Sequence, residues 1–246
     1  MSNSKQRHLA IIPAFNESQS VGNVVRQIHE EMPECDVVVI DDGSVDGTPR
    51  FVPEGARVII LPFNLGIGGA MQTGYRYAAL NGYDVAVQVD ADGQHPPTQV
   101  KKLIDELEKS DADMVIGSRF KKTIEYRQTL SRMVGIHWLR HFTKLLTGLW
   151  ITDPTSGFRA VNKNVISAFA HWYPDDYPEP EVIVLLHRAG FNITEIQVEM
   201  NQRETGETSI PFARGLFYVI KVSASLVLDL IREPWPPAVI KHEESS

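Results

Sequence analysis

The sequence alternates short apolar runs with longer stretches of helical periodicity, and this alternation limits the possible folds more than any other feature. Five runs rich in Val, Ile and Leu have the length of buried parallel strands, at residues 9–12, 37–40, 58–61, 85–89 and 114–116. Helix-like stretches lie between them at residues 17–32, 70–80 and 98–109. This order predicts an α/β domain whose mostly parallel sheet is flanked by helices.

The second half of the chain has a different pattern. It contains, in order, a helix-rich stretch at residues 128–147, a short strand at 158–161, two more helices, a strand at 193–199 and a helix at 211–231. The last helix is amphipathic, because its polar residues Arg214, Lys221, Ser225 and Arg232 share one face. Such a helix either lies in a membrane interface or packs on its own core or on a second copy.

Composition narrows the classes of function. The net charge of −7 argues against a protein that coats nucleic acid through bulk positive charge, so we expect no nucleic-acid partner. The lone Cys35 excludes an intramolecular disulfide framework. The polar N-terminus lacks the apolar segment of a signal peptide, and Lys221 and Asp229 interrupt the apolar C-terminal region. These features predict a cytoplasmic protein.

Acidic side chains follow two of the predicted strands at the point where each strand ends. The segments are Asp41-Asp42-Gly43-Ser44 and Asp90-Ala91-Asp92-Gly93-Gln94-His95. Ligands of parallel sheets bind at the carboxyl ends of strands. Carboxylate and amide oxygens, such as those of Asp90, Asp92 and Gln94, suit a Mg²⁺ or Mn²⁺ ion that holds a diphosphate. The alternative is a structural turn, because Asp-Gly is a common turn dipeptide.

A glycine-rich turn, Gly66-Ile67-Gly68-Gly69, follows the third predicted strand. A dinucleotide-binding fingerprint would need a third Gly where Met71 stands, and it would follow the first strand. We therefore favour a tight turn into a helix and keep an NAD-dependent oxidoreductase as the weaker alternative.

Several motifs occur in the order found in family 2 glycosyltransferases of the GT-A fold. They are Ile12-Pro13-Ala14-Phe15-Asn16-Glu17, Asp41-Asp42-Gly43-Ser44, Asn64-Leu65-Gly66 and Asp90-Ala91-Asp92-Gly93-Gln94-His95-Pro96. Three later segments resemble the dolichyl-phosphate-mannose-synthase-like branch, which loads a sugar onto a polyprenyl phosphate. These are Gly117-Ser118-Arg119, Asp153-Pro154-Thr155-Ser156-Gly157-Phe158-Arg159 and Arg203-Glu204-Thr205-Gly206. The resemblance implies a Rossmann-like GT-A catalytic domain over residues 1–210. The residue pattern itself predicts an amphipathic helix over 211–233 and a flexible tail over 234–246.

The resemblance also implies roles for individual residues. The residues expected to bind the nucleotide are Pro13, Ala14, Asn16, Glu17, Asp42, Gly68, Asp90 and Ala91. The residues expected to hold Mg²⁺ or Mn²⁺ are Asp90, Asp92 and Gln94, where the ion would neutralise the leaving nucleoside diphosphate. The residues expected to bind phosphates, including that of the acceptor, are Arg119, Arg127, Ser131 and Arg203. Ile67 departs from the branch pattern, in which Lys is frequent at this position.

The chemistry of the acceptor decides whether the site needs a general base. A hydroxyl acceptor needs one, and Asp153 and Glu181 are the candidates, although Glu179 and Glu181 could instead stabilise a helix N-terminus. A lipid phosphate is already largely ionised near neutral pH, so it needs positioning and charge compensation. Residues 119–144 contain seven Lys or Arg and one acid. This cationic segment favours contact with phosphates and membrane headgroups over a solvated helix face.

Together these features predict a metal-dependent, inverting glycosyltransferase. We expect it to transfer sugar from a nucleotide sugar, a UDP-sugar rather than a GDP-sugar, to a polyprenyl phosphate for cell-envelope glycan synthesis. We expect peripheral attachment to the inner face of the cell membrane, with a small membrane-protein partner or a homo-oligomer as further options. The alternatives are a glycosyltransferase that acts on a saccharide hydroxyl and a non-catalytic subunit that binds a nucleotide sugar.

Overall fold

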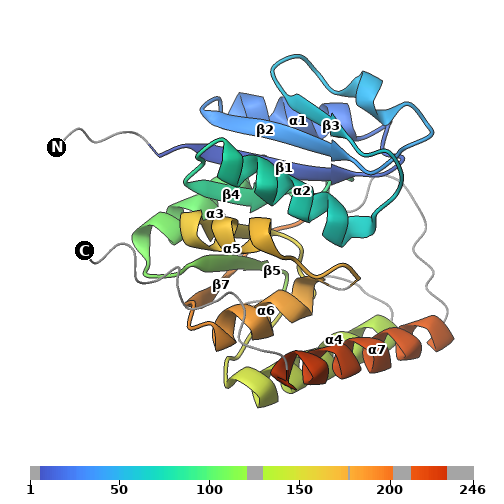
Figure 1. Cartoon of the computed structure of the whole chain (residues 1–246), viewed down its shortest axis with the longest axis vertical. Helices are drawn as coiled ribbons and strands as arrows, with labels where there is room; N and C mark the ends of the chain where they lie inside the picture. The colour runs from blue at the N-terminus through green and yellow to red at the C-terminus, as the bar shows by residue number, and fades with distance from the viewer. Residues whose placement is uncertain (1–5, 121–129, 177, 202–211, 232–246) are drawn as a thin grey trace.

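The computed structural model describes residues 6–120, 130–176, 178–201 and 212–231, without the side chains of 130–132 and 212–218. The strands are β1 (His8–Ala14), β2 (Cys35–Asp41), β3 (Arg57–Ile60), β4 (Val85–Gln88), β5 (Met114–Ser118), β6 (Arg159–Asn162) and β7 (Ile193–Gln197). They form one sheet in the order β3-β2-β1-β4-β6-β5-β7 (Figure 1). Neighbours are parallel except at β6, which is antiparallel to β4 and β5.

Helices cover both faces of this sheet. They are α1 (Val21–Glu31), α2 (Gly66–Leu80), α3 (Pro97–Lys109), α4 (Leu130–Thr147), α5 (Lys163–His171), α6 (Pro178–Arg188) and α7 (Phe212–Ile231), with a short 3₁₀ helix η1 (Thr48–Phe51). Ala10 and Ile12 of β1 face the core under α1 and α3, while Leu9 and Ile11 face the core under α2, α5 and α6. Burial on both faces explains why the strands are almost continuously apolar. The prediction of a mostly parallel sheet flanked by helices is confirmed.

The second helix begins earlier than its apolar pattern predicted, at Gly66 rather than at residue 70. The Asp42 carboxylate causes this difference, because it accepts hydrogen bonds from the backbone N–H groups of Leu65 (2.7 Å) and Gly66 (2.9 Å). The first N–H groups of a helix have no partner within the helix, so an anion there stabilises its start. Asp42, the residue that follows β2, thus fixes where α2 begins.

One edge of the sheet collects the segments that carry polar residues. The parallel neighbours β1 and β4 end at this edge. The antiparallel β6 begins there, since its first residue, Arg159, pairs with Gln88, the last residue of β4. The segment before β6 therefore meets the segment after β4, and a cleft between them lies where ligands of open α/β sheets bind.

The helices α4 and α7 lie side by side next to α6, away from the sheet (Figure 1). An apolar cluster of Leu139, Val184, Val222 and Leu226 joins the three helices. The amphipathic helix expected at the C-terminal end thus packs one side on the chain's own helices. Among the helices that the structure describes, none combines the length and the apolar character needed to cross a membrane. The expected tail at 234–246 lies outside the described residues.

Candidate functional site

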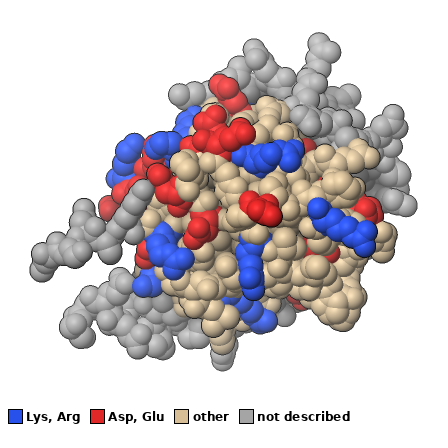
Figure 2. Space-filling view, turned by 90° about the horizontal axis from the view of Figure 1, so that it is seen from above, with Lys and Arg blue, Asp and Glu red and all other residues tan. Residues whose placement is uncertain are grey.

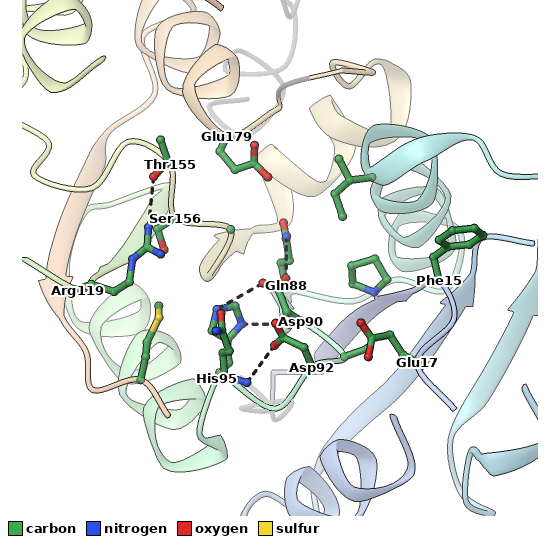
Figure 3. A pocket seen from close by; sticks show the side chains of 16 residues that line it. Phe15, Glu17, Gln88, Asp90, Asp92, His95, Arg119, Thr155, Ser156 and Glu179 are labelled. Atoms are coloured by element: carbon green, nitrogen blue, oxygen red, sulfur yellow. Dashed lines mark hydrogen bonds and ion pairs between the residues drawn. The ribbon is translucent and has the colours of Figure 1, made fainter. Parts of the chain in front are cut away.

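A cleft of about 320 Å³ opens at the edge where β1 and β4 end (Figure 3). Its walls come from the ends of β1 and β4 with the segments that follow them, the start of α2 and the residue after β5. The segment before β6, the start of α6 and the segment after β7 complete them. The predicted site residues among its lining are Pro13, Glu17, Asp90, Ala91, Asp92, Gln94 and Arg119. Residues far apart in the sequence are therefore brought together, and they include carboxylates and an arginine.

Other predicted site residues do not line the cleft. Ala14 is buried in the core beneath α1, and the Asp42 carboxylate caps α2 as described above. The Asn16 side chain accepts a hydrogen bond from the Val45 N–H (3.0 Å). Gly68 packs so closely on the 174–175 backbone that a Cβ there would collide with it.

For three of the predicted phosphate-binding residues, the position of the side chain relative to the cleft is not described. Arg127 and Arg203 lie outside the described residues. Ser131 lies in the first turn of α4, but its side chain is not among those described.

Hydrogen bonds within one loop fix the two carboxylates that follow β4. Nδ1 of His95 accepts from the Asp90 N–H (3.0 Å), and its Nε2 lies 3.7 Å from the Asp90 carboxylate. The Gln88 amide donates to Asp90 Oδ1 (3.4 Å), and Asp92 Oδ1 accepts from the Gln94 N–H (3.0 Å). Sequence reasoning had not assigned Gln88 a role, although a polar residue within an otherwise apolar strand run was a signal for one.

The side chains of Asp90, Asp92 and Gln94 form a donor set of hard oxygens that suits Mg²⁺ or Mn²⁺. Within the described part of the chain, no group of three or more His, Cys, Asp or Glu residues is placed to hold a metal ion. Mg²⁺ is typically held by one or two carboxylates together with the phosphates of a substrate. The donor set thus fits an ion that binds with a diphosphate.

The imidazole of His95 is buried and stacks on the Phe158 ring, with 4.4 Å between the ring centres. Burial lowers the pKa of His95, while the nearby carboxylates of Asp90 and Asp92 oppose this shift. The ring is therefore neutral at neutral pH. Because Nδ1 accepts from the Asp90 N–H, the proton of the neutral ring is on Nε2, which faces the Asp90 carboxylate.

Replacing His95 by Asn is expected to make protein stability less sensitive to acid. The lowered pKa means that the folded protein binds fewer protons at His95 than the unfolded chain does, so the free energy of unfolding falls as the pH drops below about 6.5. Asn offers an acceptor for the Asp90 N–H but does not titrate in this range. Urea unfolding at about pH 7.5 and about pH 5.5 measures the difference.

The exposed His171 supplies the matched control. His171→Asn should lose stability with acid as the unsubstituted protein does. If His95→Asn shows that same acid dependence, the buried neutral imidazole is not its source.

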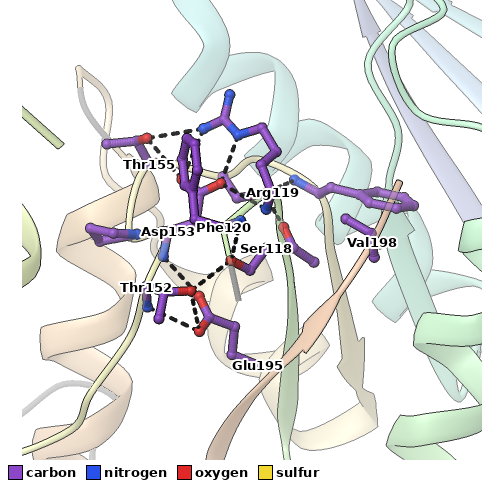
Figure 4. Close-up of polar contacts among 12 residues, drawn as sticks. Ser118, Arg119, Phe120, Thr152, Asp153, Thr155, Glu195 and Val198 are labelled. Carbon is purple, nitrogen blue, oxygen red and sulfur yellow. Dashed lines mark hydrogen bonds and ion pairs between the residues drawn. The ribbon is translucent and has the colours of Figure 1, made fainter. Parts of the chain in front are cut away.

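A buried ion pair joins Arg119 to Asp153 (Figure 4). Nε and Nη2 of Arg119 donate to the two carboxylate oxygens at 2.6 and 2.8 Å. The Asp153 side chain is 0% exposed and that of Arg119 is 8% exposed. The Thr155 hydroxyl bonds to both partners. Arg119 lines the cleft and Asp153 does not, so this carboxylate orients a cation of the cleft.

Two glutamates at the start of α6 point in different directions. Glu179 lines the cleft, whereas the Glu181 carboxylate accepts a hydrogen bond from the Ser225 hydroxyl of α7 (2.7 Å). Residues two apart do not share a helix face. Burial raises the pKa of Glu179, an effect that the charge of the buried Arg159 opposes. Arg159 also holds this helix start, since its Nη2 donates to the Glu179 carbonyl oxygen (2.6 Å).

The cationic segment at 119–144 is only partly described. Besides Arg119, the described cations are Arg140, which donates to the Thr152 carbonyl (3.0 Å), and Lys144, whose Nζ lies 4.8 Å from the centre of the Trp150 ring. The others lie outside the described side chains. Figure 2 shows the face at the opposite end of the molecule from α4, where basic and acidic side chains are interspersed. The described cations of the segment thus make specific internal contacts.

Comparison with known proteins gives consistent matches. The model of a family described as "Glycosyl transferase family 2" matches residues 9–169. Polyprenol monophosphomannose synthase of Mycolicibacterium smegmatis is 31% identical over 212 residues, which is 82% of this chain and 80% of that protein. UDP-N-acetylglucosamine–dolichyl-phosphate N-acetylglucosaminyltransferase of Methanococcus voltae is also 31% identical, over 83% of this chain and 88% of that protein.

A solved structure with a similar fold is glucosyl-3-phosphoglycerate synthase from Mycobacterium tuberculosis. It was crystallised with Mn²⁺, UDP and phosphoglyceric acid. The TM-score is 0.64 at 20% identity, and the match covers 92% of this chain and 78% of that one. At this identity the likeness concerns the fold.

Proposed function

Since the chain belongs to glycosyl transferase family 2 and has its GT-A fold, we propose that it transfers a sugar from a nucleotide sugar to a polyprenyl phosphate. One observation carries the choice of acceptor. The carboxylates of Asp153 and Glu181, the two candidate bases, are hydrogen-bonded away from the cleft, whereas Arg119 lines it. An arginine in the cleft wall suits an acceptor that is already ionised, such as a phosphate. The names of the similar proteins, which include a polyprenol and a dolichyl-phosphate enzyme, support the same acceptor.

The nucleotide sugar binds along the carboxyl ends of β1 and β4. Pro13 and Glu17 form one wall for the nucleotide, and Asp90, Asp92 and Gln94 are the residues that would hold Mg²⁺ or Mn²⁺. When bound, the ion neutralises the negative charge of the leaving nucleoside diphosphate. The donor is a UDP-sugar in this proposal, and a parallel assay with GDP-sugars tests that choice.

The acceptor phosphate enters from the side of Arg119. Its oxygen attacks the anomeric carbon from the face opposite the diphosphate, so that the configuration inverts. A phosphate monoester has its second pKa near 6 and needs no base at neutral pH. Arg119 keeps the orientation that Asp153 gives it and compensates the charge of the incoming phosphate.

Glu179 supports a second candidate function, transfer to a saccharide hydroxyl. It is a carboxyl in the cleft wall whose pKa burial raises, and a general base works best when its pKa approaches the working pH. The two functions make opposite predictions for Glu179→Gln. If the acceptor is a hydroxyl, Glu179→Gln should lose most of the transfer rate. If the acceptor is a phosphate, the variant should keep that rate.

An extraction assay tests the proposal. The protein is incubated with radiolabelled nucleotide sugars, Mg²⁺ or Mn²⁺ and undecaprenyl phosphate, and the products are partitioned into organic solvent. We expect acid-labile label in the lipid phase that persists in Glu179→Gln. Label confined to water-soluble glycan and lost in Glu179→Gln would establish the hydroxyl acceptor instead. Tight binding of nucleotide sugar without any transfer would indicate a non-catalytic subunit.

The lipid acceptor requires contact with a membrane, and we propose that the outer surface of α4 and α7 makes it. Apolar side chains are exposed there on both helices, among them Trp138, Leu145, Ile220, Leu228 and Ile231. Tryptophan beside exposed aliphatic side chains is typical of helices that lie in a membrane interface. The cytoplasmic leaflet of the cell membrane is the surface expected.

Leu145→Glu is expected to weaken membrane binding without unfolding the protein. Leu145 is 78% exposed on α4, so the substitution places a charge on the membrane-facing surface and removes no core contact. Co-sedimentation with anionic liposomes measures the bound fraction. Leu80→Glu is the matched control, because Leu80 is 86% exposed at the end of α2. Equal binding by both variants and the unsubstituted protein would rule out this surface.

A further inference from the structure

A buried carboxylate behind the cleft, that of Glu195 in β7, holds the backbone of residues 152–153 (Figure 4). One of its oxygens accepts from the Asp153 N–H (2.8 Å). The other accepts from both the N–H and the hydroxyl of Thr152, at 2.9 and 2.8 Å. Glu195 is 5% exposed and does not line the cleft. These three hydrogen bonds are thus directed at the segment that presents Asp153 to Arg119.

The same segment is tied to the end of β5, from which Arg119 extends. The Ser118 hydroxyl lies 2.7 Å from the Thr152 hydroxyl and accepts from the Phe120 N–H (3.1 Å), so it fixes the backbone on both sides of Arg119. β5 and β7 are paired in parallel, with Ser118 opposite Gln197. The pairing of β5 with β7 therefore sets the distance between Glu195 and Arg119.

We propose that Glu195 is a positioning residue for Arg119, acting through Thr152 and Asp153 without touching substrate. The inference rests on the proposed function, since it takes Arg119 to bind a phosphate in the cleft. The planar guanidinium of Arg119, which Asp153 already holds through Nε and Nη2, can approach an anion only in a narrow range of orientations. At metal sites, partners one step behind the metal ligands set the orientation of those ligands, and their loss lowers activity about 10- to 100-fold. We expect a loss of the same order for a residue that orients Arg119.

Glu195→Gln tests the proposal with little change in size. The amide nitrogen donates and cannot accept, so at least one of the three hydrogen bonds is lost and the 152–153 backbone must shift. We expect kcat/KM for transfer to polyprenyl phosphate to fall about 10-fold or more. Glu199→Gln, the same change at an exposed position of the following segment, should leave kcat/KM unchanged.

A double-mutant cycle with Arg119→Ala separates positioning from general structural support. If Glu195 acts through Arg119, adding Glu195→Gln to Arg119→Ala lowers kcat/KM by less than about 2-fold further. Losses that multiply would overturn the inference and leave the proposed function intact. An Arg119→Ala variant with unchanged kcat/KM would overturn the phosphate role of Arg119 itself, and with it the inference.

Substitutions at Thr152 keep the test decisive if Glu195→Gln fails to fold. Thr152→Ser retains the hydroxyl that bonds to Glu195 and Ser118, and Thr152→Val removes it at nearly constant size. We expect Thr152→Ser to retain kcat/KM and Thr152→Val to lose it about 10-fold, again without further loss in the Arg119→Ala background. Equal activity of the two Thr152 variants would contradict the proposal.

Discussion

Asp92→Ala is expected to abolish sugar transfer and to weaken Mn²⁺ binding in the same variant. Asp92 is 8% exposed, lines the cleft and is fixed by the Gln94 N–H, so its carboxylate is aimed before any ligand arrives. A divalent ion contributes several kcal/mol to the stabilisation of a leaving diphosphate. A loss of about 4 kcal/mol lowers the rate about 10³-fold. Steady-state transfer and titration with Mn²⁺ in the presence of nucleotide give the two readouts.

The control for Asp92→Ala is Asp111→Ala, the same change at an exposed position before β5. Asp111→Ala should leave both transfer and Mn²⁺ binding unchanged. Retained transfer in Asp92→Ala would remove Asp92 from the metal site. Lost transfer with unchanged Mn²⁺ binding would leave Asp92 in the cleft but give it a role other than holding the ion.

Asp153→Ala is expected to cost the protein much of its stability as well as its activity. It removes a carboxylate that is 0% exposed and leaves the Arg119 guanidinium, in a side chain only 8% exposed, without its bidentate partner. Removing one member of a buried ion pair typically costs 3–5 kcal/mol, so we expect the free energy of unfolding to fall by about 3 kcal/mol. Urea unfolding measures this loss, and transfer assays at low temperature measure the activity of the folded fraction.

The exposed pair of Asp176 and Lys221 offers a matched comparison. Its N–O distance is 2.6 Å, as in the buried pair, but the side chains are 66% and 43% exposed. Water screens such a pair, so Asp176→Ala should lower the free energy of unfolding by less than about 1 kcal/mol. If both variants lost the same free energy of unfolding, burial would not determine how much the Arg119–Asp153 pair contributes to stability.

Much of the donor side of the site was predictable because its residues are neighbours in the sequence. Asp90, Asp92 and Gln94 follow a single strand, and the turn after a strand end is short enough to place them together. The strand pattern predicted their place in the sheet, and the oxygen chemistry led to the prediction that they hold a metal ion. The resemblance to family 2 added the prediction that a nucleotide binds there, and the comparisons confirmed the family and the fold.

The partners of Arg119 were not predictable in the same way. The sequence pointed to Asp153 as a candidate general base, and it gave no role to Glu195. These residues meet Arg119 because β6 runs antiparallel between β4 and β5, and because β7 pairs with the far side of β5. No local pattern encodes strand order, so the sequence could not indicate which acid would face which cation.

The amino-acid sequence by itself determined the layered α/β architecture and the acidic strand end, since both follow from periodicity and from contacts between neighbours in the chain. Only the tertiary structure decided which contacts the carboxylates outside that strand end make. Asp153 and Glu195 form a support behind Arg119, Glu181 bonds to α7, and Glu179 alone of this group lines the cleft. The physical reason is that burial and hydrogen-bond partners set what a carboxylate can do, and both arise from segments that are distant in sequence.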